Sequence, residues 1–179
     1  MKSRPVLTLI AAVSADGFIS TGHGVPWDLP KDREHFRSVT RGQWLLIGRR
    51  TYQEMLGWFQ AGHHPLILTR NPNYTPPVGQ AVADLESALE AATQGGAREL
   101  FVCGGGAAYS AAMPRADRLI LTHVGTHLHA GVPFPALDPG IWRVVSRLES
   151  PADAENPFGM VFAAHQRYSP QNQAIDSQS

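Results

Sequence analysis

One acidic side chain stands where acid–base chemistry is plausible. Asp32 comes two residues after Pro30, which favours the first position of a helix, and Phe36 follows four residues later on the same helix face. The preceding loop, residues 20–24, is glycine-rich and leads to Trp27. A mobile loop that carries a large aromatic residue beside an acid is typical of a lid over a pocket. The alternative is structural, since a first-turn aspartate stabilises the helix dipole and a phenylalanine packs in the core.

A second set of residues is suited to phosphate. Arg49 and Arg50 precede a short helix predicted at residues 52–56, and Thr69-Arg70 repeats the pairing of a hydroxyl with a guanidinium after another predicted strand. Cations at a helix N-terminus oppose its dipole unless an anion binds there. Guanidinium and backbone N–H groups together hold a phosphate. Solvated arginines on a surface turn remain the alternative.

Three consecutive glycines, Gly104 to Gly106, end one apolar run and lead into a helical segment. Glycine allows a helix N-terminus and its backbone to approach a pyrophosphate closely. The G-x-G-x-x-G fingerprint of dinucleotide-binding folds is not met, because Tyr109 occupies its last position. By themselves these glycines are a weak signal for a dinucleotide.

The histidines and the single cysteine do not indicate a metal centre or a nucleophile. His63-His64 and His127-x-His129 are the close pairs, and neither is accompanied by paired cysteines or clustered carboxylates. Cys103 has no histidine nearby in the sequence. We therefore expect no metal site and no covalent catalysis.

The elements that must position these residues alternate between strands and helices. Near-continuous apolar runs predict strands buried on both faces at residues 6–13, 44–47, 66–68, 100–103 and 118–124. Helices are predicted at residues 30–40 and, with Asp84 as N-cap, at 85–93. This alternation predicts an α/β fold with a largely parallel sheet that helices cover on both faces.

The C-terminal part changes character. Residues 142–148 and 160–168 are extended-looking runs with no helix between them, which predicts an antiparallel ribbon at a sheet edge. Residues 169–179 are polar, and we expect this tail to be disordered.

Composition excludes several classes of protein. The 179 residues carry 15 Lys+Arg against 15 Asp+Glu and are 43% hydrophobic, which indicates one globular domain and no nucleic-acid partner. The apolar run at 6–13 is too short to span a membrane, and treating it as a signal peptide would remove a central strand. One cysteine forms no internal disulfide, so we expect a cytoplasmic protein.

In order and spacing, these motifs resemble the dihydrofolate reductase family over residues 7–167. The resemblance is specific because several motifs recur together. They are Ile10-Ala11-Ala12, Val25-Pro26-Trp27-x-Leu29-Pro30-x-Asp32-x-x-x-Phe36, Ile47-Gly48-Arg49-Arg50-Thr51, Leu68-Thr69-Arg70, Val102-Cys103-Gly104-Gly105-Gly106-x-x-Tyr109, Leu121-Thr122-His123 and Phe134-Pro135.

The resemblance implies a dihydrofolate-reductase-like domain over residues 1–168. Its α/β fold would have an eight-stranded, mostly parallel sheet, flanking helices and an antiparallel C-terminal edge strand. It implies a monomer that takes NADPH as hydride donor and reduces dihydrofolate. Asp32 would grip the pterin and favour protonation of its N5, the Thr122 hydroxyl would bond behind Asp32, and Trp27 would lie on the lid.

The same resemblance implies two sets of binding residues. Those expected to bind substrate are Ile10, Ala12, Val25, Phe36, Arg37, His63 and Tyr109. Those expected to bind NADPH are Ala12, Ile19, Gly48, Arg49, Arg50, Thr51, Thr69, Arg70, Cys103, Gly104, Gly105, Gly106, Ala107 and Tyr109, with a cis peptide between Gly104 and Gly105.

Two departures from the family pattern leave alternatives open. Residues 62–65 lack the arginine that usually pairs with the glutamate carboxylate of folate, so Arg37, His63 or His64 compensates or the substrate lacks that tail. Ala130-Gly131 replaces an expected Gly-Asp pair that helps hold the lid closed. The alternatives to dihydrofolate reduction are a reductase of another pterin or of a riboflavin-pathway pyrimidine, and a non-catalytic NADPH-binding module.

Overall fold

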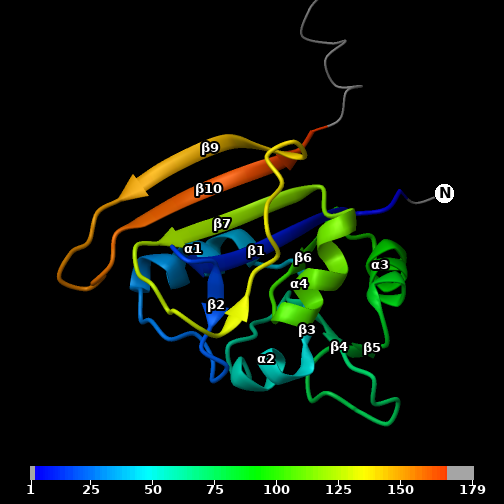
Figure 1. Cartoon of the computed structure of the whole chain (residues 1–179). Helices are drawn as coiled ribbons and strands as arrows, with labels where there is room; N and C mark the ends of the chain where they lie inside the picture. The colour runs from blue at the N-terminus through cyan, green and yellow to red at the C-terminus, as the bar shows by residue number, and fades with distance from the viewer. Residues whose placement is uncertain (1–2, 169–179) are drawn as a thin grey trace, which may run out of the picture.

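An eight-stranded sheet organises residues 3–168, the part of the chain that the computed structural model describes (Figure 1). Its strands are β1 (Val6–Ser14), β3 (Trp44–Gly48), β4 (His64–Leu68), β5 (Gln80–Val82), β6 (Glu99–Val102), β7 (Arg118–Val124), β9 (Trp142–Ser150) and β10 (Met160–Arg167). They are arranged in the order β5-β4-β3-β6-β1-β7-β10-β9. Neighbouring strands from β5 to β7 are parallel, while β10 is antiparallel to both β7 and β9.

Helices cover both faces of this sheet (Figure 1). They are α1 (Pro30–Thr40), α2 (Arg49–Glu54), α3 (Leu85–Gln94) and α4 (Gly106–Ala112), which a 3-10 turn at Met113–Arg115 extends. A small second sheet pairs β2 (Phe18–Ser20) with β8 (Val132–Pro133). Among the helices of residues 3–168, none has the length and apolar character needed to cross a membrane.

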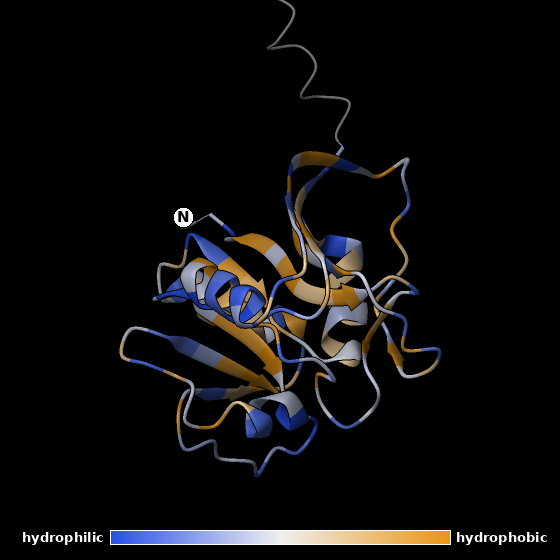
Figure 2. Cartoon of the chain, turned by 90° about the vertical axis from the view of Figure 1, so that its left-hand side faces the viewer, coloured by the Kyte–Doolittle hydropathy of each residue, from blue (hydrophilic) through white to orange (hydrophobic). Residues whose placement is uncertain are grey.

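The two faces of the sheet are packed by separate sets of apolar side chains. Alternate residues of a strand point to opposite faces, so Leu9 joins the core beneath α3 and α4, whereas Ile10 joins the one beneath α1. Phe101 packs with Ile10, and Val102 with Leu9. Burial on both faces explains the unbroken apolar runs in the sequence, and Figure 2 shows the hydrophobic colour concentrated on the central strands.

The helix starts follow from local chemistry. Pro30 occupies the first turn of α1, where its missing N–H has no partner to lose. At α3, the Asp84 side chain accepts a hydrogen bond from the Ser87 backbone N–H (2.8 Å), and the Ser87 hydroxyl oxygen accepts one from the Asp84 backbone N–H (3.2 Å). These two bonds form a capping box. Both predicted helix starts are therefore found where the sequence indicated.

The predicted fold class is confirmed, with local differences. The antiparallel C-terminal strand β10 lies one strand inside the edge, which β9 occupies. Helix α2 begins at Arg49 rather than at residue 52, so the paired arginines form its first turn. Strands β2, β5 and β8 were not predicted, because segments of two or three residues are too short for a periodic pattern. The predicted tail at 169–179 lies outside the described residues.

Candidate functional site

A cavity of about 1450 Å³ opens where β3, β4 and β6 end, beside α1 and α2. The carboxyl ends of parallel strands are the usual ligand site of such sheets. Most of the predicted site residues line it: Ile10, Ala12, Ile19, Val25, Trp27, Asp32, Phe36, Gly48, Arg49, Arg50, Thr51, Thr69, Arg70, Cys103, Gly104, Gly105, Gly106, Ala107 and Tyr109. The catalytic, substrate and cofactor predictions thus converge on one cavity.

Asp32 is the carboxylate that α1 contributes to the wall of this cavity. Burial raises the pKa of Asp32, while a hydrogen bond from the Thr122 hydroxyl and the nearby His35 act in the opposite direction. Thr122 is only 2% exposed and stands behind Asp32 without lining the cavity. A carboxylate held this way keeps an accessible face for a hydrogen-bond donor and titrates at a higher pH than an exposed aspartate.

Aromatic and aliphatic side chains surround Asp32. Phe36 lies four residues further along α1 and packs against Trp58, with ring centroids 5.1 Å apart. Trp27 also lines the cavity, and its indole Nε1 is buried without a hydrogen-bond partner within the described chain. Val25, on the loop that precedes α1, is 63% exposed. This end of the cavity offers flat apolar walls to a ring and one carboxylate to its polar edge.

The opposite end is built from glycines and arginines. The Gly48 N–H donates to the Gly104 carbonyl (2.7 Å), and the predicted cis peptide joins Gly104 to Gly105. A Cβ atom on Gly105 would lie 3.1 Å from the Thr51 Oγ1, and one on Gly106 only 2.6 Å from a methyl carbon of Val132. A side chain at Gly106 would collide with Val132 and one at Gly105 would crowd Thr51, so glycine at both positions keeps the backbone open towards the cavity.

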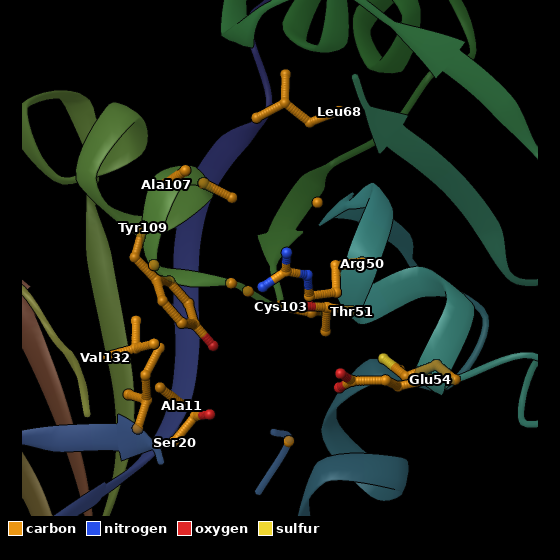
Figure 3. A pocket seen from close by; sticks show the side chains of 18 of the residues that line it. Ala11, Ser20, Arg50, Thr51, Glu54, Leu68, Cys103, Ala107, Tyr109 and Val132 are labelled. Carbon is orange, nitrogen blue, oxygen red and sulfur yellow. The ribbon is translucent and has the colours of Figure 1, made fainter. Parts of the chain in front are cut away.

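Helix α2 supplies side chains to the middle of the cavity. Figure 3 shows Arg50 and Glu54 reaching from α2 into the cavity, opposite Tyr109 and Val132. Arg49 lies over the ring of Tyr74, 5.8 Å from its centroid. The Tyr109 hydroxyl donates to the Ile10 carbonyl (2.7 Å), and burial raises its pKa far above the usual value. Tyr109 therefore remains neutral and fixes α4 to β1.

Two predicted substrate-binding residues, Arg37 and His63, do not line the cavity. The His63 ring stacks on Trp58, with centroids 4.9 Å apart, and its Nδ1 accepts from the Gln60 N–H (3.0 Å). Burial lowers the pKa of His63, which leaves its imidazole neutral at pH 7. His63 therefore offers no positive charge at neutral pH, and acts on the cavity only through Trp58.

Several lining residues were missed by sequence reasoning. Glu54 and Trp58 follow Arg50 at four-residue intervals, a helical spacing that would have placed Glu54 beside the arginine. Arg33 lines the cavity and forms an ion pair with Asp28. Val132 belongs to the two-residue strand β8, for which no sequence signal exists. The remaining unpredicted polar residues of the lining are Ser20, His23, Gln53, Asn71 and Asp84.

The loop that the sequence predicts to form a lid is connected to the distant loop before Phe134. Strand β2 pairs with β8, and a Cβ atom on Gly131 would collide with the Ser20 carbonyl at 2.0 Å. Asp16 accepts hydrogen bonds from the backbone N–H groups of Leu128 (3.1 Å) and His129 (2.7 Å), and the hydroxyl of Ser14 holds its pKa below the usual range. The Gly-Asp pair expected at residues 130–131 is absent, and the carboxylate that connects the two loops belongs instead to Asp16.

The two histidine pairs of the sequence, among the described residues, do not form part of a metal centre. His127 and His129 stack with centroids 6.0 Å apart. Throughout residues 3–168, no group of three or more His, Cys, Asp or Glu side chains is arranged to hold a metal ion.

Comparison with known proteins agrees with this geometry. The family model described as dihydrofolate reductase matches residues 6–167, so the chain belongs to the dihydrofolate reductase family. Dihydrofolate reductase type 3 of Salmonella typhimurium is 33% identical over 162 residues, covering 90% of this chain and 98% of that protein. The Bacillus subtilis dihydrofolate reductase is 28% identical over 162 residues, covering 90% and 95%.

Solved structures support the same fold. Dihydrofolate reductase from Enterococcus faecalis, complexed with NADP(H) and RAB-propyl, superposes with a TM-score of 0.83 at 24% identity. The match covers 92% of this chain and 97% of that one.

Proposed function

We propose that the protein reduces 7,8-dihydrofolate to 5,6,7,8-tetrahydrofolate with NADPH. The observation that carries this proposal is one cavity with a buried carboxylate, Asp32, at one end and an arginine- and glycine-rich wall at the other. Hydride transfer requires donor and acceptor rings to meet in a site that excludes water. Family membership supports both the donor and the acceptor.

Asp32 would bind the polar edge of the pterin. Its carboxylate accepts hydrogen bonds from N3–H and the 2-amino group, and Thr122 holds it from behind. A carboxylate at that edge would increase the basicity of N5, which would take one proton from solvent before C6 receives the hydride. The rings of Phe36 and Trp58 and the side chain of Ile10 would enclose the pterin and exclude water.

The residues at the other end fit NADPH. A glycine backbone without Cβ atoms leaves room for a pyrophosphate, and Arg49, Arg50 and Arg70 with the hydroxyls of Thr51 and Thr69 suit the remaining phosphate. When bound there, NADPH supplies the hydride. An arginine-rich wall favours a 2′-phosphate over a bare ribose.

Recognition of the folate tail differs from the family pattern. Where an arginine is usual, His63 is neutral, half-buried and engaged with Trp58. Loss of a charge-assisted pair weakens binding by about 1.5–3 kcal/mol. We infer that this protein binds dihydrofolate chiefly through the pterin and the rings near it.

The protein would act as a cytoplasmic monomer on small molecules. The exposed edge strand β9 has a bulge where Val144 meets His165, together with the charged side chains Arg143, Arg147 and Glu149. Bulges and charges on an edge strand discourage pairing with a second copy. Size-exclusion chromatography with light scattering is expected to give the mass of one chain, 19.4 kDa, and a mass of two chains would contradict this.

The direct test of the proposed function is NADPH oxidation by the purified protein. We expect consumption of NADPH to depend on dihydrofolate and to match the tetrahydrofolate formed, one for one. Absence of turnover with dihydrofolate would overturn the proposal, and tight NADPH binding without any turnover would favour the non-catalytic module.

A further inference from the structure

His35 lies one helical turn after Asp32 on α1 and has no part in the mechanism above. Its ring packs against Phe162 of β10, with centroids 4.7 Å apart and planes inclined at 55°. Phe162 stands opposite Thr122 in the register of β10 and β7, and the Thr122 hydroxyl bonds to Asp32. His35, Phe162, Thr122 and Asp32 therefore form a continuous group behind the pterin end of the cavity.

The His35 imidazole is half-buried, and among the described residues one of its two ring nitrogens lacks a hydrogen-bond partner. Within the described chain, its Nε2 is buried and no acceptor or donor lies in reach. Burial lowers the pKa of His35, and the Asp32 carboxylate opposes that effect. The ring is neutral at pH 7 and gains its charge only in acidic solution.

Other charged groups face His35 from the elements packed around it. His35 borders a second cavity of about 480 Å³, which Lys31 and Glu34 of α1 and Glu149 of β9 also line. The Lys31 ammonium is engaged by Asp153, at 2.6 Å. Among the described residues, β7 and β10 contribute only uncharged side chains to this cavity: Ile120, Phe162, Ala163 and Ala164.

Taking the proposed function as its basis, we propose that His35 is a positioning residue whose protonation in acidic solution keeps the Asp32 carboxylate ionised and able to bind the pterin. A cation three residues away on a helix lies on the same face and favours the charged form of an acid. His35 itself touches neither substrate nor cofactor in this arrangement.

The test compares wild type with His35→Gln, which keeps a polar side chain but cannot carry charge. We expect the acidic midpoint at which KM for dihydrofolate rises to move upward by about 0.3 pH unit in the variant. Above the midpoint, KM, kcat and the Kd for NADPH stay at wild-type values. His64→Gln, the same substitution at an exposed histidine outside the cavity, is expected to leave the midpoint unchanged.

A second measurement separates this proposal from the proposed function. Titration of the Asp32 carboxyl carbon by NMR in the full chain is expected to give a higher midpoint in His35→Gln than in wild type. Identical midpoints, or an equal shift in His64→Gln, would overturn the role of His35. Lack of dihydrofolate reduction by wild type would instead overturn the proposed function, and the NMR comparison would still decide the role of His35.

Discussion

The two ends of the main cavity use charge in opposite ways. At the cofactor end, Arg49, Arg50 and Arg70 line the wall around a glycine backbone. At the substrate end, the lining guanidinium of Arg33 is paired with Asp28, and a neutral His63 lies behind Trp58. Under the proposed function, this difference directs the positive charge of the cavity to NADPH and leaves the substrate to one carboxylate and to aromatic surface.

The largest expected effect comes from removing the single carboxylate of the substrate end. Asp32→Asn is expected to lower kcat/KM for dihydrofolate at neutral pH by about 100-fold or more, because the charged partner of the pterin edge is lost. The Kd for NADPH, measured by fluorescence titration, should not change. Glu90→Gln, which removes an exposed carboxylate that does not line the cavity, serves as the control, and wild-type turnover in Asp32→Asn would contradict the role of Asp32.

Removing charge from the cofactor end should weaken NADPH binding and leave substrate binding unchanged. Arg50→Gln is expected to raise the Kd for NADPH about tenfold or more, because a charge-assisted contact to phosphate is lost. KM for dihydrofolate should stay at its wild-type value. Arg41→Gln removes an exposed arginine that does not line the cavity, and it should change neither constant. An equal loss of substrate affinity in Arg50→Gln would show that the two ends do not divide the charge.

Adding a positive charge to the substrate end should have a smaller effect, and it should raise activity rather than lower it. His63→Arg is expected to raise kcat/KM for dihydrofolate by up to about tenfold, through a new pair with the glutamate carboxylate. A dihydropterin without that tail should gain nothing. His64→Arg, next to it and exposed, is the control. Equal gains for both substrates would mean that the added guanidinium does not act on the tail.

The smallest expected effect concerns stability. Burial raises the pKa of Asp32, so the folded protein binds this proton more tightly than the unfolded chain and the ionised carboxylate opposes folding. Asp32→Asn should therefore raise Tm at pH 7, and the gain should disappear as the pH falls below the unfolded value of 3.8. A lower Tm at pH 7, measured by calorimetry, would show that the ionised carboxylate stabilises the fold.

Much of this arrangement was predictable because its signals are local. The apolar runs predicted the central strands, Pro30 and Asp84 predicted two helix starts, and the spacing of Asp32 and Phe36 predicted a shared wall. Contacts made by short or distant segments were not predictable. Val132 reaches the cavity through a two-residue strand, and Asp16 ties the loop near residue 129 across more than a hundred residues of sequence.

His63 shows a different limit of the sequence. Its position could be matched to a family pattern, but the sequence does not reveal what surrounds its side chain. Its place suggested substrate binding, yet stacking on Trp58 and the bond from the Gln60 N–H turn it away from that task. Only the packing reveals that its imidazole is neutral and outside the cavity.

The division of charge between the two ends is tested most directly by one ratio. It is kcat/KM of the wild-type protein for dihydrofolate divided by kcat/KM for a dihydropterin that lacks the glutamate tail, both measured by NADPH oxidation. Among the described residues that line the substrate end, Arg33 carries the guanidinium and is paired with Asp28, which predicts a ratio below about ten. A ratio above about one hundred would mean that a cationic group binds the tail after all, and would contradict the account.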